Sequence, residues 1–177
     1  FAKAVGPIAY IVRARFVGLR DLGPALSPTN AFQIIQGLET VTLRMEKHCS
    51  NAAKVAEYLS SHEKVSKVIY AGLDEGEAGV RANKYLKGGH GALCGFELKG
   101  GKPSGEKFIN NLNMFYHVAN IGDARSLAIH PATTTHSQLS DEDMESAGVN
   151  PSYVRLSIGI EPIDDIIEDL KNALEAA

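Results

Sequence analysis

The feature that most constrains the fold is a helical pattern of apolar residues that continues without interruption from residue 27 to residue 61. Ser27 is placed to cap this helix and Pro28 to occupy its first position, and the apolar residues then recur at steps of three, four and seven. A helix of this length extends over roughly 50 Å, whereas the mean globular helix has about 11–12 residues. We therefore expect one long helix between two bodies, and we place any bend at Gly37.

A shorter helical pattern occupies residues 7–22, opened by Pro7 and ended by the Gly-Pro pair at residues 23–24. The chain starts with Phe1 rather than Met, and Phe1 enters this pattern without a cap. We therefore expect a piece of a longer protein. Our predicted division is residues 1–26, a helix and linker, and residues 27–177, a domain that includes the long helix.

After residue 61 short strand patterns alternate with helical ones. The expected strands are residues 65–70, 92–98, 115–120, 126–130 and 153–160. The expected helices are residues 76–86, one capped by Ser104, one capped by Ser140 and a last one that begins at Pro162. The prediction is an α/β fold with one small, mostly antiparallel sheet covered by helices on one face.

Composition excludes several classes of partner. The net charge of -3 and the absence of a basic run give no reason to expect nucleic acid or an anionic membrane as a partner. No stretch approaches the roughly 18 apolar residues of a membrane span. The two cysteines, Cys49 and Cys94, lie within apolar patterns and not in a Cys-x-x-Cys pair, which favours reduced thiols in a cytoplasmic protein.

Arg155 is the strongest single candidate for a binding residue. It stands on the polar face of an apolar strand, next to Ser157 on the same face. Its planar guanidinium could bind a carboxylate through two parallel hydrogen bonds. A salt bridge at the rim of a solvated sheet explains the same pattern, and spacing alone leaves both interpretations open.

Residues 120–136 are the second candidate, because they are rich in hydroxyl groups and punctuated by glycine and proline. His130 and His136 lie in this segment, but a metal site needs at least three ligands and no further cluster supports one. Ordinary turns explain the threonines at 133–135 nearly as well as a ligand does. His48, beside the apolar stripe of the long helix, is interpreted as a buried histidine with satisfied hydrogen bonds.

Three separated segments resemble the Cys/Met-metabolism pyridoxal-phosphate (PLP) enzymes, in the order in which that family has them. Residues 22–53 resemble the family's linker helix through a Ser-Pro, a Gly-Leu-Glu-Thr, a Leu-Arg-Met and a histidine. Residues 120–140 resemble its substrate-proximal segment, and residues 154–170 its final strand and helix. The resemblance covers essentially the whole chain, and it implies the small C-terminal domain of a fold-type I PLP enzyme, preceded by a long linker helix.

The resemblance also implies roles for particular residues. It makes Arg155 the residue that binds the α-carboxylate of an amino-acid substrate, with Ser126 and Leu127 lining the same group. In the family, the lysine that holds PLP and most of the cofactor site belong to the large domain. No lysine here has the expected active-site context, so the resemblance implies no catalytic residue, no bound PLP and no activity for this chain alone.

The implied reaction of the intact enzyme is γ-replacement, in which sulfide or a thiol displaces the acyl group of an O-acylhomoserine. The segment at residues 126–136 most resembles members that act on O-acetylhomoserine. Methionine γ-lyase, O-succinylhomoserine sulfhydrylase and cystathionine γ-synthase are the alternatives within the family, and a non-catalytic binding or dimerisation module is the alternative outside it. Family members are homotetramers, so the resemblance also implies a homo-oligomer.

Overall fold

The computed structural model describes residues 2–177, so the interpretation of Phe1 lies outside the described residues. The chain divides into two compact units, one that ends at Val41 and one from Thr42 to Ala177. The division falls later than the boundary expected after residue 26. Burial explains this position, because none of residues 2–41 is buried and the first buried side chain is that of His48.

The first unit is helical. Its elements are α1 (Ala2–Val5), η1 (Gly6–Ile8), α2 (Ala9–Arg13), η2 (Ala14–Asp21) and α3 (Pro28–Glu39). The helix expected at residues 7–22 is therefore present but starts at Ala2 and includes a 3₁₀ turn and a π-helical segment. Ser27 caps α3 as predicted, since its Oγ accepts a hydrogen bond of 3.1 Å from the Asn30 N–H.

The long helix expected from residue 27 to residue 61 is interrupted at Thr40. There α3 ends, with Thr40 at φ -111° and ψ 7°, and α4 (Val41–Ser60) begins at the next residue. Gly37, where we expected any bend, stays inside α3. Thr40 starts a run of three β-branched residues that continues to Thr42, and such residues lose side-chain freedom in a helix. That run accounts for the position of the break better than a glycine does.

The second unit contains a five-stranded sheet with the order β1-β2-β5-β4-β3. The strands are β1 (Val65–Ile69), β2 (Leu93–Leu98), β3 (Tyr116–His117), β4 (Leu127–Ile129) and β5 (Tyr153–Ser157). After α4, the helices are α5 (Glu77–Tyr85), α6 (Gly101–Asn110), η3 (Pro131–Thr133), α7 (Asp141–Ser146) and α8 (Ile163–Ala176). All strand pairs are antiparallel except β3 with β4, which confirms the predicted sheet.

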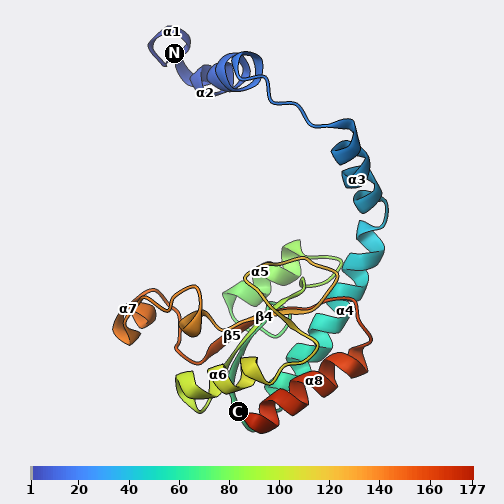
Figure 1. Ribbon diagram of the computed structural model, residues 1–177, viewed down its shortest axis with the longest axis vertical. Helices are drawn as coiled ribbons and strands as arrows, with labels where there is room; N and C mark the ends of the chain where they lie inside the picture. Colours follow the sequence, from blue (N-terminus) through green and yellow to red (C-terminus); the bar gives the residue numbers. More distant parts are fainter. Residues whose placement is uncertain (1) are drawn as a thin grey trace. The chain divides into compact units, whose positions relative to one another are not determined.

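Helices α4, α6 and α8 supply the core that covers one face of this sheet (Figure 1). Phe96 of β2 and the alternating residues Val154 and Leu156 of β5 are fully buried in it, and Phe96 contacts the Phe108 ring of α6 edge-on, with 5.2 Å between ring centroids. The predicted stripe of α8 is buried at Ile166, Leu170 and Leu174, whereas Ile163 and Ile167 are only partly buried.

Two boundaries differ from the sequence expectation. Ser104 does not cap α6, because this helix begins at Gly101, whose φ of +69° is available to glycine without strain. The final strand is also shorter than residues 153–160, since regular pairing in β5 ends at Ser157. Ser140 does cap α7 as predicted, with its Oγ 3.2 Å from the Asp143 N–H.

Candidate carboxylate-binding site

Strand β5 lies at the centre of the sheet and carries Arg155 on the face opposite the helices. The register pairs Arg155 with Gly95 of β2 on one side and with Ile129 of β4 on the other. Because successive side chains of a strand alternate, Arg155 lies on the other face from the buried Val154 and Leu156. The central strand therefore presents a cation on the face that the core helices leave uncovered.

Gly95 leaves space beside the arginine, and the Tyr153 ring occupies it. A Cβ atom at Gly95 would collide with the Tyr153 ring and hydroxyl, so this ring lies directly over the glycine. Burial raises the pKa of the Tyr153 hydroxyl, and the positive charge of Arg155 offsets part of that rise. The two side chains are thus electrostatic neighbours on one face of β5.

Arg155 has no carboxylate partner among residues 2–177. Its one hydrogen bond is long, 3.4 Å from Nη2 to the Asn120 carbonyl oxygen, and no described acidic side chain forms an ion pair with it. The rim salt bridge that the sequence left open is therefore not what the structure shows. A partly exposed guanidinium with most of its donors unused can bind a carboxylate from outside this chain.

The segment between β3 and β4 lies beside the arginine. Besides the Asn120 carbonyl, it contributes the Gly122 N–H, which donates a 3.2 Å hydrogen bond to the Ser157 hydroxyl. The Arg125 guanidinium stacks over the Tyr116 ring with 4.8 Å between its Cζ and the ring centroid. Hence residues 120–122 are in contact with the polar face of β5.

Ser126 and Leu127, the other two predicted site residues, are buried, with exposed fractions of 0% and 3%. Leu127 pairs with Ser157, two residues beyond Arg155 on the same strand, so it shares a sheet face with Arg155. Ser126 donates from its N–H and its hydroxyl to the two carboxylate oxygens of Glu161, at 2.6 and 2.9 Å. The structure thus brings Leu127 near Arg155 but assigns the polar groups of Ser126 to Glu161.

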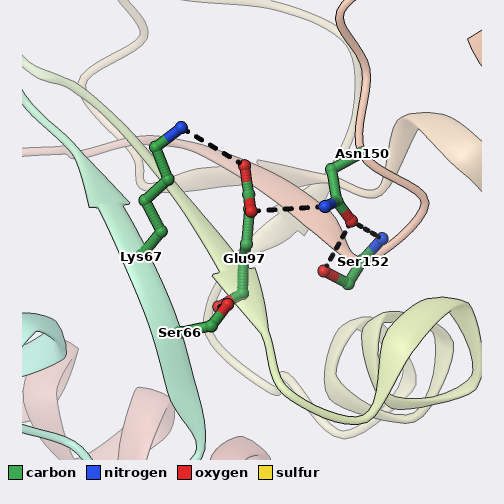
Figure 2. A network of polar contacts seen from close by, with 5 residues as sticks. All are labelled: Ser66, Lys67, Glu97, Asn150 and Ser152. Carbon is green, nitrogen blue, oxygen red and sulfur yellow. Dashed lines mark hydrogen bonds and ion pairs between the residues drawn. The ribbon is translucent and has the colours of Figure 1, made fainter. Parts of the chain in front are cut away.

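The start of β5 is fixed by a second polar network, drawn in Figure 2. Glu97 of β2 forms a 3.8 Å ion pair with Lys67 of β1 and accepts a 3.3 Å hydrogen bond from the Asn150 amide. The side-chain oxygen of Asn150 in turn accepts from both the N–H and the hydroxyl of Ser152. The residues just before β5 are therefore tied to Glu97 of β2, which also pairs with Lys67 of β1.

His130, which follows the last residue of β4, also contacts the residues just before β5. Its Nε2 lies 2.8 Å from the Pro151 carbonyl oxygen and its Nδ1 lies 3.0 Å from the Thr133 hydroxyl. Burial lowers the pKa of His130, which favours the neutral ring. The histidine thus has a structural role here, and within residues 2–177 no group of three potential ligands could hold a metal.

The remaining candidates from the sequence also have structural roles. Nδ1 of the buried His48 donates a 2.6 Å hydrogen bond to the Ile158 carbonyl, as expected for a satisfied histidine. Both cysteines are free; Cys94 is buried and Cys49 only partly so, and burial raises the pKa of the Cys94 thiol to about 12. Glu161 was missed by sequence reasoning, although a carboxylate between an apolar strand and a helix-starting proline was a visible signal.

The site was also tested against PLP, the cofactor that the resemblance implies. Such a cofactor needs a lysine amine and donors for a phosphate group. Arg155 and residues 120–126 contribute a guanidinium, backbone groups and no lysine side chain, while Lys64 donates to three carbonyls at the end of α8. No catalytic step through PLP is assigned to these residues.

Fold and site together define an α/β domain with a partly exposed arginine on the central strand of its sheet. The chain belongs to the family of Cys/Met metabolism PLP-dependent enzymes, whose sequence profile matches residues 7–175. No helix in the described part of the chain combines the length and the apolar character needed to cross a membrane.

Several relatives within this family are similar over nearly the whole chain. An O-acetyl-L-homoserine sulfhydrylase of Leptospira meyeri is 56% identical over 95% of this chain and 38% of its own length. A homocysteine synthase of Schizosaccharomyces pombe is 46% identical over 100% and 41%. An L-methionine gamma-lyase of Fusobacterium nucleatum is 44% identical over 91% and 41%. The chain thus spans about two fifths of the length of these relatives.

A solved structure shows the same fold. It is that of a Campylobacter jejuni protein named O-acetylhomoserine (thiol)-lyase, which contains N'-pyridoxyl-lysine-5'-monophosphate. The two chains share 44% sequence identity and superpose with a TM-score of 0.83, over 96% of this chain and 40% of the other. The predicted α/β domain of a PLP enzyme is therefore confirmed.

Proposed function

We propose that this chain supplies the substrate-carboxylate site of an O-acetylhomoserine sulfhydrylase. The reaction is γ-replacement: the bond between Cγ and the acetoxy oxygen breaks, a bond from Cγ to sulfur forms, and the products are homocysteine and acetate, or methionine when methanethiol replaces sulfide. The observation that carries the proposal is Arg155, a partly exposed cation on the central strand that no carboxylate of residues 2–177 neutralises. The relatives of this name support the choice of reaction.

In this proposal Arg155 binds and orients the amino-acid substrate. Two parallel hydrogen bonds from its guanidinium to the α-carboxylate fix both the position and the rotation of the α-carbon. Correct orientation of reacting groups contributes several kcal/mol to rate acceleration in general, on the order of 7–11 kcal/mol in the best cases. The long bond to the Asn120 carbonyl engages one guanidinium nitrogen and leaves the fork available to the substrate.

Contacts of Ser126 and Leu127 with the substrate remain a prediction. Both side chains are buried, and a contact through the Ser126 hydroxyl would require it to exchange a 2.9 Å bond to Glu161. Leu127 is the better placed of the two, because it shares the sheet face of Arg155.

Besides the substrate and the sulfur donor, we propose a further copy of the same protein as a partner. The first unit exposes many large apolar side chains, among them Tyr10 at 83% and Leu22 at 78%, and α3 exposes further ones. Apolar surface of this extent favours burial against protein. A homo-oligomer of the complete enzyme would provide that burial.

The test uses the full-length enzyme with Arg155 replaced. We expect Arg155→Ala to lower kcat/KM for O-acetylhomoserine by about a hundredfold, because two charge-assisted hydrogen bonds are lost. Arg155→Lys keeps the charge without the two-pronged geometry and should have an intermediate effect. Arg81→Ala is the control, since Arg81 is an exposed arginine on α5 whose ion pair to Glu77 measures 3.9 Å. Unchanged kinetics in Arg155→Ala with a lowered melting temperature would instead identify a structural arginine.

A second candidate activity follows from the methionine γ-lyase relative. Two assays of the same preparation distinguish it from the first: homocysteine formed from O-acetylhomoserine and sulfide, and methanethiol released from methionine. A sulfhydrylase is faster in the first assay by orders of magnitude. Faster release of methanethiol would reassign the reaction and leave the role of Arg155 intact, since both substrates are α-amino acids.

A further inference from the structure

The connection from β5 to α8 is held by side chains from two other segments. Asn51 of α4 donates from its amide to the carbonyl oxygens of both Gly159 and Glu161, at 3.0 and 2.9 Å. The Ile160 N–H donates to the Ala124 carbonyl at 2.9 Å. His48 of α4 donates to the Ile158 carbonyl. Together these hydrogen bonds join α4 and Ala124 to the connection between β5 and α8.

Glu161 and Ser126 form the tightest part of this joint. The carboxylate accepts from the N–H and the hydroxyl of Ser126, and the same hydroxyl oxygen accepts a 2.9 Å bond from the Gly159 N–H. Gly159 has no room for a side chain, because a Cβ there would collide with the Glu161 carboxylate and with the backbone at Ala124 and Arg125. The position of Glu161 therefore determines where residues 124–126 lie.

The same segment reaches Arg155 a few residues earlier. The Asn120 carbonyl accepts the bond from the guanidinium, and the Gly122 N–H donates to Ser157. Only three residues lie between Gly122 and Ser126, so a shift of Ser126 at its Glu161 contact is transmitted to Gly122. The chain of contacts runs from Glu161 through Ser126 and Asn120 to the guanidinium.

We propose that Glu161 is a positioning residue of the carboxylate site and that it acts through Ser126 on residues 120–122. This inference rests on the proposed function of Arg155. We call the pair Glu161 and Ser126 the latch. The latch fixes the position of the Asn120 carbonyl, and the hydrogen bond to that carbonyl orients the Arg155 guanidinium. Without the latch the arginine keeps its charge but samples orientations that do not match a carboxylate, and affinity for the carboxylate falls.

The experiment compares two ligands on the full-length holoenzyme: norleucine, which has an α-carboxylate and no leaving group, and pentylamine, which is the same molecule without the carboxylate. The measured quantity is the ratio of their inhibition constants. Glu161→Gln is expected to reduce the preference for norleucine about tenfold, equivalent to roughly 1.4 kcal/mol. The control Glu168→Gln makes the same charge change at an exposed position of α8 and should leave the ratio unchanged. Ser126→Ala, which keeps the N–H bond to Glu161, should reduce the ratio by less.

Arg155→Ala separates failure of this inference from failure of the proposed function. If Arg155→Ala abolishes the preference and Glu161→Gln does not change it, the positioning role is overturned and the carboxylate site stands. If Arg155→Ala also leaves the preference intact, the proposed function itself is overturned. A purely structural Glu161 would lower the melting temperature of Glu161→Gln without changing the ratio.

Hydrogen exchange in the unsubstituted enzyme tests the same inference if the variants do not fold. Norleucine should slow exchange of the amides in residues 120–126, because a bound carboxylate stabilises the aligned arginine and with it the latch. Pentylamine should not. Equal protection by both ligands would overturn the inference.

Discussion

The two ends of β5 are both held by other segments, but by different kinds of contact. At its end, the partners are buried side chains of α4 and the Ser126–Glu161 latch, with Ser126, Asn51 and His48 at 0–2% exposure. At its start, the buried His130 is joined by a partly exposed glutamate and an exposed lysine. The difference indicates that the end of the strand is held by buried contacts throughout, whereas the exposed contacts at the start tolerate change.

The largest effect is expected at Gly159. Gly159→Ala places a Cβ against the backbone of Ala124 and Arg125, which cannot move aside without breaking the latch. Overpacking of this kind costs typically about 1–3 kcal/mol, and we expect about 3 kcal/mol here in chemical denaturation of the chain. Gly37→Ala is the matched control, because a Cβ there meets nothing within 4 Å. Equal stability of the two variants would contradict the rigid end.

The next effect is expected at Asn51. Asn51→Ala removes the donor of two carbonyl groups, those of Gly159 and Glu161, and leaves both without this partner. A buried polar group that loses its hydrogen bond costs about 1–3 kcal/mol, so we expect the free energy of unfolding to fall by about 2 kcal/mol. Ser50→Ala, at the exposed neighbouring position of α4, serves as the control. If Asn51→Ala lowers the free energy of unfolding by no more than Ser50→Ala does, water replaces the amide as hydrogen-bond donor.

A pH dependence should distinguish the start of the strand. Burial lowers the pKa of His130; the hydrogen bond to the Pro151 carbonyl and the charge of Glu106 oppose that shift, and Lys102 and His117 add to it. The folded state therefore binds fewer protons than the unfolded state, and stability declines as the pH falls below the ordinary histidine value of 6.5. The slope from one proton is at most about 1.4 kcal/mol per pH unit. Urea denaturation between pH 7.5 and 5 should show a shallower slope in His130→Gln; identical slopes would remove His130 as the cause.

The smallest effect is expected at Lys67. Its side chain is 62% exposed and its 3.8 Å ion pair with Glu97 is screened by water. Lys67→Ala should change the free energy of unfolding by less than about 0.5 kcal/mol. The same denaturation assay at low and high salt checks this, and a loss as large as that in Asn51→Ala would erase the contrast between the two ends.

Sequence patterns predicted the regular elements of the second unit because each is set by local periodicity. The alternation of Val154 and Leu156 defines β5, and the stripe through Ile166 and Leu170 defines α8. Caps at Ser27 and Ser140 were recognisable for the same reason, since a cap bonds to a residue three positions away. Arg155 could be proposed as a ligand because it is a cation on the polar face of an otherwise apolar strand.

The rest depends on contacts that no local pattern contains. Ser126 and Glu161 are 35 positions apart, so neither residue indicates the other in the sequence. The family resemblance places Ser126 at the substrate, which stays a prediction, and its hydrogen bond to Glu161 could be found only in the structure. The break at Thr40 was missed because apolar spacing continues across it, and only the conformational preference of β-branched residues marks the site.

The strand order has a consequence for synthesis of the chain. Because β5 lies between β2 and β4, the sheet cannot close until residues 153–157 leave the ribosome, and until then the facing edges of β2 and β4 are unpaired. Emerging intermediates with open edges are prone to aggregation. A nascent chain that stalls before Tyr153 would hold two incomplete half-sheets, and we expect such chains to depend on chaperones until the last strand arrives.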